Sequence, residues 1–470
     1  MKNRLMIKDL VSKVGEEAVI AGWVHVRRDH GKLAFFEIRD ASGLVQAVYF
    51  RAGEKLDSTI DKLRSEFVVK ISGLVKARPE KMINPDHPTG TIEFEIQNLI
   101  IINESATPPF EITETKESVH EDKRMQYRYL DLRREKMQFN IRFRHKLISE
   151  FRRYLDDADF VEIETPILTK SSPEGARDYL VPSRLSPGKF FALPQAPQQF
   201  KQLLMIAGFE KYYQIARCFR DEDQRGDRQP EFTQLDLEMS FVSEEDILEF
   251  NEAMFRNVIS SLMPEKKLPK KFPRLTYAEA MEKYDSDKPD LREDKNDSNE
   301  LAFCWIVDFP VFEKTPEGHL TFAHNPFALP KADDTELLKS DKEEDLLKMR
   351  AHCYDLVLNG VEISSGSMRI HDPKIQKAIF ERFGLSDTEV QERFGNFLAA
   401  FKYGTPPHGG MAPGIDRLVT VLLDEQSIRE VIAFPKTGDA HDLMFDSPGL
   451  VSSAQLNELN IKITDKKKKD

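Results

Sequence analysis

The sequence predicts an α+β fold, with an N-terminal OB-type β-barrel followed by a larger domain built on an antiparallel sheet flanked by helices. Residues 1–106 contain five short strand-like runs separated by turns that carry Gly and Asp, as is typical of such a barrel. Beyond them, helical periodicity alternates with strand-like runs, and residues 218–241 indicate a strand, a loop and a strand. The 470 residues allow two or three domains.

Composition and charge narrow the classes of protein. The net charge is −12, so any nucleic-acid surface must be a local basic patch. The sequence has neither an apolar run near the roughly 18 residues of a membrane span nor the apolar core of a signal peptide. Its three cysteines form no CxxC pair, which excludes a zinc knuckle and a disulfide framework. We therefore expect a cytoplasmic protein with no membrane partner.

The barrel strands are expected at residues 19–24, 34–38, 44–49, 67–73 and 92–96. Between the first two strands, the basic stretch 27–32 leads to Phe35 and Phe36. Alternation places one of these rings in the core and leaves open which of them is exposed. An exposed ring beside cations suits the stacking of unpaired bases.

The segment 218–241, CFRDEDQRGDRQPEFTQLDLEMSF, predicts a hairpin with a charged tip. Charge runs usually only face solvent. Here, however, Arg220 ends the first strand, and Gln234, Asp236 and Glu238 share one face of the return strand. A fixed guanidinium beside acids and amides suits a substrate that has both anionic and cationic groups, such as a nucleotide phosphate and an amine.

The remaining helices and strands are predicted from hydrophobic periodicity and from the Gly and Pro residues that interrupt it. We expect a helix over 138–158, a strand over 160–164 ended by Thr165-Pro166, and, after residues 195–201, a helix through Met205. Further helices are expected within 242–292, over 350–360 before a strand at 361–370, and directly after Gly414. The Lys-rich end, DKKKKD, is expected to be solvated charge.

The motif FRDED…RQPEFTQLD closely resembles the second signature motif of class II aminoacyl-tRNA synthetases, and in detail that of the bacterial aspartyl-tRNA synthetases. The resemblance covers nearly the whole chain. GWVHVRRDHGKLAFFEIRD resembles the anticodon-binding barrel, the helix and strand before Pro166 resemble the first motif, which builds a homodimer interface, and GMAPGIDRLVTVLL resembles the third. These matches imply an anticodon-binding OB domain at 1–106, a hinge linker at 107–135 and a class II catalytic domain at 136–470.

Two stretches bear on that organisation. In the bacterial family, DKPDLR leads into a large inserted domain, but here only a short polar tract near 293–300 follows it, so the insertion is missing. The linker carries a basic group that suits contact with the tRNA backbone. This group consists of Arg124, Arg128, Arg133 and Arg134.

The resemblance implies that L-aspartate reacts with ATP to form aspartyl-adenylate, which is then transferred to the 3′ end of tRNA(Asp). Arg220 would bridge the aspartate carboxylate and the α-phosphate, Arg417 would bind the γ-phosphate, Phe232 would stack on adenine and Glu222 would accept a hydrogen bond from the adenine amino group. Mg²⁺, held by Asp355 and Glu362 through water and phosphate oxygens, is the implied cofactor.

The remaining assignments rest on the same resemblance. Aspartate binding is assigned to Glu174, Gln198, Lys201, Arg220, Gln234, Asp236, His324 and Arg369. ATP binding is assigned to Arg220, Asp221, Glu222, Gln229, Phe232, Glu362, Gly414, Ile415, Asp416 and Arg417. Anticodon binding is assigned to Arg28, His30, Phe35, Gln46, Lys81 and Glu93. The chain departs from the family at Ala196, where Ser is usual, and at Asn325, where a second His is usual.

Selectivity for aspartate is expected to be electrostatic. Lys201 and Arg369 would pair with the side-chain carboxylate, and asparagine would leave both cations without a counter-charge in a closed pocket. Removing one partner of a buried ion pair costs about 3–5 kcal/mol, enough to exclude the amide.

Several alternatives remain open. Asparaginyl- and lysyl-tRNA synthetases share the barrel and the motifs, although Lys201, Arg369 and the DKPDLR segment favour aspartate. An asparagine-synthesising amidoligase would lack the barrel, and a non-catalytic tRNA-binding paralogue should have lost Arg220, Glu362 or Arg417. His30 resembles the forms that also charge tRNA(Asn), whereas Lys81 resembles the stricter ones.

Overall fold

The structure, a computed structural model, describes residues 3–51, 55–112, 119–171, 175–223, 226–315 and 317–464. Glu174 and the Lys-rich end after residue 464 lie outside the described residues. The chain forms two units, Met1–His120 and Glu121–Asp470, each with its own hydrophobic core.

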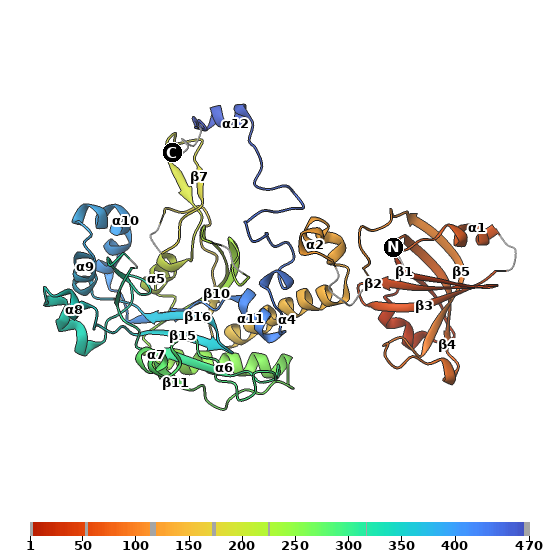
Figure 1. The fold of residues 1–470 in the computed structure, drawn as a ribbon, viewed down its shortest axis with the longest axis horizontal. Coiled ribbons are helices and arrows are strands. Elements are labelled where there is room, and N and C mark those ends of the chain that lie inside the picture. Colours follow the sequence, from red (N-terminus) through yellow and green to blue (C-terminus); the bar gives the residue numbers. More distant parts are fainter. Residues whose placement is uncertain are drawn as a thin grey trace. The chain divides into compact units, whose positions relative to one another are not determined.

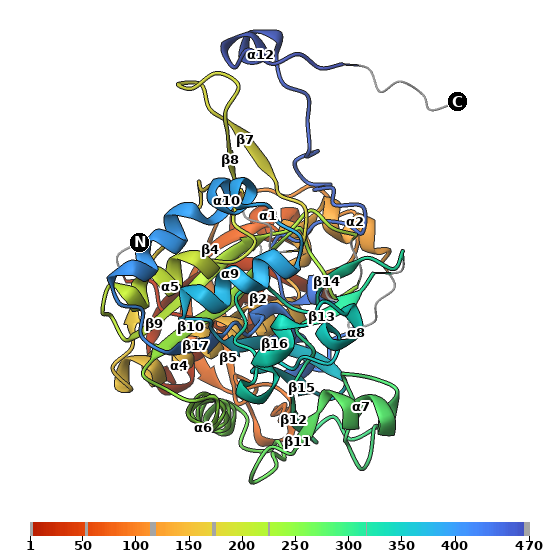
Figure 2. The ribbon, with the colours of Figure 1, turned by 90° about the vertical axis from the view of Figure 1, so that its left-hand side faces the viewer.

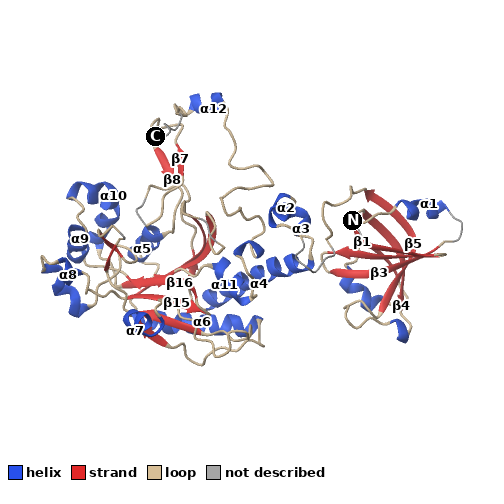
Figure 3. Cartoon of the chain, in the orientation of Figure 1, coloured by secondary structure: helices blue, strands red, loops and turns tan. Residues whose placement is uncertain are grey.

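The first unit is a closed five-stranded barrel in the order β1-β2-β3-β5-β4 (Figure 3), which confirms the predicted OB fold. Alternate residues of its strands point inward, so Phe36 is buried and Phe35 lies on the outer face, partly exposed. Gly73 is required by packing, because a Cβ there would overlap the carbonyl oxygen of Glu95 on the neighbouring strand. The strands are β1 (Glu17–His30), β2 (Leu33–Asp40), β3 (Gly43–Phe50), β4 (Val68–Ala77) and β5 (Ile92–Asn103). The short helices of this unit are η1 (Ile7–Lys13), α1 (Lys55–Lys62) and η2 (Glu80–Met82).

The second unit is built on an eight-stranded sheet in the order β11-β12-β15-β16-β17-β10-β9-β6. All pairs from β12 to β9 are antiparallel, as predicted, whereas the edge pairs β11–β12 and β6–β9 are parallel. The strands are β6 (Val161–Glu162), β9 (Lys211–Phe219), β10 (Glu231–Ser240), β11 (Arg274–Thr276), β12 (Phe303–Val307), β15 (Cys353–Leu358), β16 (Val361–Met368) and β17 (His408–Met411). Two small sheets accompany it, β7 (Leu180–Pro182) with β8 (Phe190–Ala192), and β13 (Phe312–Lys314) with β14 (Leu320–Phe322).

Helices surround this sheet (Figure 1). The α-helices are α2 (Glu121–Gln126), α3 (Arg128–Asp131), α4 (Glu135–Asp157), α5 (Gln198–Ile206), α6 (Glu244–Leu262), α7 (Tyr277–Tyr284), α8 (Glu343–Leu346), α9 (Pro373–Arg382), α10 (Asp387–Ala400), α11 (Ile415–Leu422) and α12 (Ser453–Glu458). The short 3₁₀ helices are η3 (Ala332–Lys339), η4 (Phe401–Tyr403) and η5 (Ile428–Glu430). None of the described helices has the length and apolar character needed to cross a membrane.

The two faces of β10 have different environments. Leu235, Leu237 and Met239 point into the main core, which also contains apolar side chains of α4, α6 and α11. Asp236 and Glu238 point to the opposite face, where Lys201 of α5 meets them. The alternation along one strand therefore separates a dry core from a buried polar face.

One predicted element is wrong. Residues 350–360 were expected to form a helix, but Cys353–Leu358 is the strand β15, which pairs with β16 on one side and β12 on the other. All six of its residues are buried, so it lacks the alternation that marks a half-buried strand. The turn after it, Asn359-Gly360, has positive φ at both residues, the conformation typical of a tight hairpin.

The linker region also differs from expectation. Residues 121–135 belong to the second unit, and Arg124, Arg128 and Arg134 are buried instead of facing RNA. Asp131, itself fully buried, pairs with all three guanidinium groups at 2.6–3.3 Å. Arg124 also binds Glu430 at 2.7 Å, and Arg128 donates to the carbonyls of Arg429, Ile432 and Ala433. Arg124 and Arg128 hold α2 and α3 against η5, because Arg124 binds Glu430 and Arg128 binds the Arg429 carbonyl.

The arm formed by β7 and β8 projects from the body of the second unit (Figure 2). It carries exposed apolar side chains at both of its strands and at its tip. These are Leu180, Leu185, Phe190 and Phe191.

Candidate functional site

The predicted hairpin forms from β9 and β10, which pair from Phe219 and Glu231 at the loop end to Lys211 and Met239. Arg220 follows β9 directly, and its guanidinium lies over the ring of Phe232, 5.0 Å from the centroid. Its Nε is buried and has no hydrogen-bond partner in the described part of the chain. A buried donor without an acceptor is costly, so this guanidinium is held ready for an anionic ligand.

Four charged side chains form a buried cluster beside this hairpin, and they come from α5, β10 and the end of β16. Lys201 Nζ lies 2.6 Å from Asp236 Oδ1 and 3.3 Å from Glu238 Oε2. Arg369 donates to both Glu238 oxygens, at 2.9 and 3.2 Å, and to Ser367 Oγ at 2.5 Å. None of the four charged residues is more than 2% exposed.

The pKa values of the two carboxylates shift in opposite directions. Burial raises the pKa of Asp236, and the single contact with Lys201 does not offset it. Burial also acts on Glu238, but Arg369 and Lys201 together hold its pKa below the ordinary value. Glu238 is therefore the fixed anion of the cluster, and Asp236 Oδ2 has no partner among the described residues.

This cluster corrects the expected basis of selectivity. Lys201 and Arg369 were expected to lack a counter-charge unless the substrate supplied one. In the structure, Asp236 and Glu238 already neutralise them, since two unpaired buried cations would be very unfavourable. A ligand therefore meets a neutral group of two cations and two anions.

Other residues assigned to aspartate border the cluster. Gln198 begins α5, and its Nε2 is buried without a partner in the described residues. Gln234 Nε2 instead contacts the Ala412 carbonyl at 3.3 Å, and Gln234 Oε1 lies 3.2 Å from Cys218 Sγ. The Gln234 amide is thus engaged with the sheet.

His324 lies near the other end of the site. Its ring packs edge-on against Phe309 with centroids 4.4 Å apart, and its Nδ1 lies 3.4 Å from Ser365 Oγ. Burial lowers the pKa of His324, which favours a neutral imidazole at neutral pH. Its neighbour Asn325 accepts a hydrogen bond from the Phe327 amide at 3.0 Å, so Asn325 shapes the turn.

The residues assigned to the triphosphate lie where β16, α11 and the hairpin loop meet. Arg417 Nη1 donates to the Glu362 carbonyl at 3.0 Å, and Nη2 pairs with Asp227 at 3.1 Å. Glu362 Oε2 pairs with Lys288 Nζ at 2.9 Å. Within the described residues, the side chains of Arg417 and Glu362 are therefore both paired with charged groups of the protein.

The two carboxylates assigned to magnesium fit a hard cation. Burial and the nearby charge of Glu362 raise the pKa of Asp355 well above its usual value, and Asp355 Oδ1 is buried without a partner among the described residues. No group of three or more His, Cys, Asp or Glu is arranged for a metal in the described part of the chain. A metal here would take its remaining ligands from phosphate and water, as Mg²⁺ commonly does.

Three residues assigned to ATP lie at the start of α11, and the side chain or main-chain amide of each contacts the protein itself. Asp416 pairs with Arg144 of α4 and accepts from the Thr233 amide at 2.9 Å. The Ile415 side chain is fully buried in the core, and the Gly414 amide donates to the Ile363 carbonyl at 2.8 Å. These contacts set the position of Arg417 on the first turn of the helix.

The remaining assigned residues of the hairpin loop are also engaged. Gln229 is buried, and its amide exchanges hydrogen bonds with the main chain of Lys436 at 2.7 and 2.9 Å. Glu222 pairs with Arg228 at 2.9 Å, and the Asp221 amide donates to the Arg177 carbonyl at 3.0 Å.

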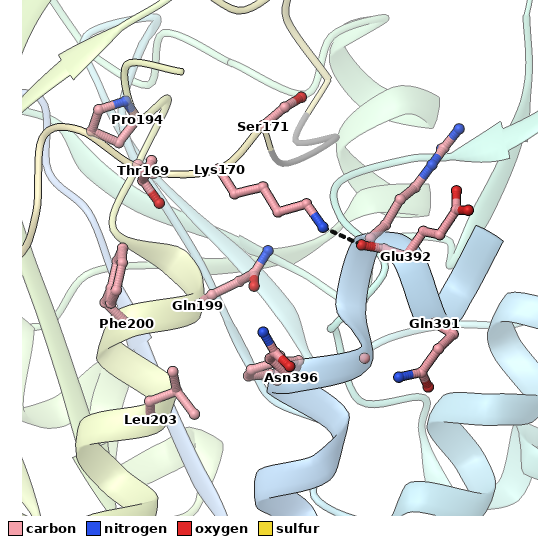
Figure 4. A pocket seen from close by; sticks show the side chains of 14 residues that line it. Thr169, Lys170, Ser171, Pro194, Gln199, Phe200, Leu203, Gln391, Glu392 and Asn396 are labelled. Atoms are coloured by element: carbon pink, nitrogen blue, oxygen red, sulfur yellow. Dashed lines mark hydrogen bonds between the residues drawn. The ribbon is translucent and has the colours of Figure 1, made fainter. Parts of the chain in front are cut away.

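Figure 4 shows a separate cavity of about 450 Å³ between the segment 169–171, α5 and α10. Gln199 and Asn396 face it, and Lys170 closes one side by donating to the Glu392 carbonyl. Ala196, which departs from the family pattern, lines this cavity.

On the barrel, five of the six assigned anticodon residues lie on neighbouring strands β1, β2, β3 and β5. Arg28, Phe35 and Gln46 line a shallow hollow, and Arg28 pairs with Glu37 at 2.7 Å. The His30 ring meets Phe35 edge-on with centroids 5.7 Å apart. Glu93 directly precedes Phe94, which pairs with Ala47, the neighbour of Gln46. Lys81 is exposed on η2, and no contact between Lys81 and these residues is seen in the described part of the chain.

Three residues of the site had no predicted role. Glu238 joins Lys201 to Arg369, and its place two residues after Asp236 on the same strand face was the available signal. Lys288 was noticed only as part of the DKPDLR segment, and Asp227 only as a charge at the hairpin tip. Nothing in their sequence spacing indicated their partners.

Comparisons with known proteins agree with this geometry. A family model described as tRNA synthetases class II (D, K and N) matches residues 120–438, and one described as OB-fold nucleic acid binding domain matches residues 18–102. The aspartate–tRNA(Asp/Asn) ligase of Rubrobacter xylanophilus is 43% identical over 576 positions, covering 96% of this chain and 95% of that protein. The aspartate–tRNA ligase of Macrococcus caseolyticus is 40% identical, with 98% and 99% covered. Both alignments are longer than this chain, so these relatives contain residues that it lacks.

Similar solved structures include two bound to an adenylate. The asparaginyl-tRNA synthetase of Pyrococcus horikoshii complexed with asparaginyl-adenylate has a TM-score of 0.73 at 22% identity, covering 93% of this chain and 99% of that one. The asparaginyl-tRNA synthetase of Entamoeba histolytica in complex with asparaginyl-adenylate has a TM-score of 0.72 at 25% identity, with 93% and 98% covered.

Proposed function

Since the chain belongs to the class II tRNA synthetases of the aspartate, lysine and asparagine group, we propose that it is an aspartate–tRNA ligase. It joins L-aspartate to AMP at the expense of ATP and transfers the aspartyl group to the 3′ end of tRNA(Asp). The observation that carries this proposal is the buried cluster of Lys201, Asp236, Glu238 and Arg369.

The charge of this cluster favours aspartate. The ammonium and the side-chain carboxylate of aspartate add one charge of each sign. The cluster of four charged groups then becomes a cluster of six, and its net charge stays at zero. Asparagine brings only the ammonium and leaves one uncompensated buried cation, and lysine brings two cations. An uncompensated buried charge costs several kcal/mol, which suffices for discrimination without editing.

Within the pocket, we assign the ammonium to Asp236 and the side-chain carboxylate to Lys201 and Arg369. Among the described residues, Asp236 Oδ2 meets no hydrogen-bond donor at full hydrogen-bond geometry, and the raised pKa of its carboxyl group would fall toward the ordinary value beside a second cation. Glu238 Oε2 lies 3.3 Å from Lys201 Nζ and 3.2 Å from Arg369 Nη2, so the two cations meet at one oxygen and would bind one substrate carboxylate together. Gln198 supplies a further buried donor.

Activation requires alignment more than acid or base chemistry. The attacking group is the α-carboxylate of aspartate, already an anion, so no proton has to be removed from it. Arg220 lies at the strand end next to Phe232 and would contact both this carboxylate and the α-phosphate, while adenine stacks on Phe232. Arg417 would bind the terminal phosphate. Mg²⁺ held by Asp355 and Glu362 would neutralise phosphate charge.

For tRNA, the exposed Phe35 with Arg28, Gln46 and Glu93 offers an aromatic surface and polar groups for unpaired anticodon bases. We infer that tRNA(Asn) is a second substrate, because His30 lies against Phe35 and the Rubrobacter relative is named for both tRNAs. Charging each purified tRNA with labelled aspartate tests this, and product on tRNA(Asp) alone would end the dual assignment.

We also infer a homodimer acting in the cytoplasm. Exposed apolar side chains lie on and beside the first-motif elements α4 and β6, as expected for a surface that another chain covers. They are Phe139, Val161, Ile167 and Leu168. Light scattering of the purified chain should give twice the monomer mass, and a single-chain mass would contradict the inference.

Amino-acid-dependent ATP–pyrophosphate exchange tests the central proposal. Aspartate should support exchange at least a hundredfold better than asparagine or lysine at equal concentration, from the several kcal/mol of an uncompensated buried charge. Equal exchange with asparagine would point to the asparaginyl enzyme, and binding of tRNA without exchange to a non-catalytic paralogue.

A further inference from the structure

We propose that, in the ligand-free protein, two internal ion pairs occupy the positions of the ATP-bound metal and phosphate. Lys288 binds Glu362 where the metal would bind, and Asp227 binds Arg417 where the phosphate would bind. This inference rests on the proposed ATP-binding function and deepens it. It adds two positioning residues, neither of which belongs to the assigned ATP or metal ligands.

Lys288 occupies the position of a cation at the metal site. Its Nζ lies 2.9 Å from Glu362 Oε2, and its positive charge also acts on Asp355, whose Oδ1 has no partner among the described residues. A magnesium ion bound to the same oxygen would sit about 2.1 Å from it. An ammonium held that close to the ion would be strongly repelled. Lys288 must therefore turn away when a metal binds through Glu362 Oε2.

The backbone around Lys288 places it there. Gly360, in the turn between β15 and β16, has φ +81°, and a Cβ built on it would lie 3.3 Å from Asp290 Cβ and 3.8 Å from the Lys288 carbonyl oxygen. Asp290 in turn pairs with Arg292 at 2.8 Å. The segment that carries Lys288 is thus packed against the hairpin whose second strand carries Glu362.

Asp227 occupies the position of an anion at Arg417. Arg417 Nη2 lies 3.1 Å from Asp227 Oδ2, while Nη1 stays on the Glu362 carbonyl at 3.0 Å. The Asp227 side chain is 54% exposed and that of Arg417 is 26% exposed. One edge of the guanidinium is therefore anchored, and the other holds a solvent-accessible carboxylate that a phosphate can replace.

Because of the two ion pairs, Glu362 and Arg417 have an oppositely charged partner both with and without ATP and metal. Without Lys288, Glu362 would face the second carboxyl group, Asp355, with no close ammonium, and the two would repel when both are ionised. Without Asp227, Arg417 would keep its hydrogen bond to the Glu362 carbonyl and the Glu362 carboxylate oxygen Oε1 at 3.9 Å. The metal and the phosphate each displace one internal partner, so Lys288 and Asp227 each weaken the binding of the ligand whose position they occupy.

The metal half is tested with Lys288→Met in the full chain. Binding of Mn²⁺, followed by the loss of its free electron paramagnetic resonance signal, should be about threefold to tenfold tighter than in the wild type, as for the loss of a competing, partly exposed ion pair. Lys283→Met is the matched control, since Lys283 is exposed on α7 in the same region. Unchanged or weaker Mn²⁺ binding would overturn this half, and a merely structural role predicts weaker binding.

The phosphate half is tested with Asp227→Asn. Calorimetric binding of ATP without divalent ions should tighten about threefold, because Arg417 loses its competing carboxylate. Asp223→Asn is the control, an exposed carboxylate of the same loop without an ion pair among the described residues. If the wild type binds ATP and Asp227→Asn binds it no better, the inference fails. If the wild type binds no ATP with or without magnesium, the proposed function itself fails.

Discussion

In the proposed function, Lys201 is the residue on which selection of the amino acid depends most directly. It is the only cation in contact with Asp236 among the described residues and one of two in contact with Glu238. Because α5 presents it to the polar face of β10, its ammonium sits inside the fold and cannot be replaced by solvent. A change at this position therefore acts on charge balance and on substrate contact together.

We predict that Lys201→Leu abolishes aspartate activation. The change leaves Asp236 without its cation and removes one contact to the substrate carboxylate, a loss of about 3–5 kcal/mol or two to four orders of magnitude in rate. ATP–pyrophosphate exchange measures it, with Lys189→Leu on the exposed arm as the control. Near-normal exchange in Lys201→Leu, with the fold retained, would refute the assignment.

At the scale of elements, β17 shows how closely backbone and site are coupled. It lies between β16 and β10, and Gly409 and Gly410 let the three strands approach. A Cβ on Gly410 would overlap the Leu237 carbonyl oxygen and Glu238 Oε2. The strand therefore needs a glycine beside the charged cluster, because the space is already filled.

Gly410→Ala should lower both stability and activity. Overpacking of a filled interior costs about 1–3 kcal/mol, and here the relief of the overlap must move Glu238 away from Arg369. Urea unfolding and aspartate-dependent exchange measure the two effects. Gly414→Ala is the stability control, since its Cβ would meet nothing closer than 3.7 Å. Equal unfolding midpoints for both variants would contradict this account.

One buried carboxylate positions three arginines of the segment 121–135. Asp131 is the shared acceptor of Arg124, Arg128 and Arg134, and Glu430 serves only Arg124 among them. Asp131→Asn removes the carboxylate that these three buried guanidinium groups share, so we predict a loss of about 3–5 kcal/mol in the free energy of unfolding. Glu135→Gln, an exposed carboxylate at the start of α4, should change it by less than about 0.5 kcal/mol in the same urea titration. A comparable loss in both would show that the network is not the cause.

For the whole molecule, the proposed function assigns recognition of the anticodon to one of the two units and activation of the amino acid to the other. The anticodon residues lie in Met1–His120, and every residue assigned to aspartate, ATP or metal lies in Glu121–Asp470. Each unit has its own core. The two functions should therefore respond to different substitutions.

Phe35→Ala should weaken tRNA binding about tenfold, the loss of one stacked base, while leaving ATP–pyrophosphate exchange unchanged. Filter binding and exchange measure the two properties. Phe50→Ala is the control, because Phe50 is also an exposed aromatic of the barrel, 58% accessible, outside the hollow that contains Phe35. Parallel losses of both properties in Phe35→Ala would indicate a general defect of folding.

Much of the architecture could be predicted from local patterns. The five barrel strands, the hairpin around Arg220 and the helix after Gly414 follow from alternation, turn residues and a glycine before an apolar helix. The strand at Cys353–Leu358 could not be distinguished from a helix, because a strand buried on both faces has no period of two. The basic stretch at Arg124–Arg134 looked solvent-exposed because its acceptors, Glu430 and the carbonyls of Arg429, Ile432 and Ala433, are some three hundred residues away in sequence.

By itself, the sequence determined the OB fold, the family and the charged residues that we assign to the amino-acid and phosphate ends of the proposed site. Only the tertiary structure decided how those charges are paired. It showed that Lys201 and Arg369 are already neutralised by Asp236 and Glu238, and that Glu362 and Arg417 hold Lys288 and Asp227. The reason is physical: periodicity reports which face of an element a residue occupies, whereas the cost of burying a charge is met by partners that only folding brings within a few ångströms.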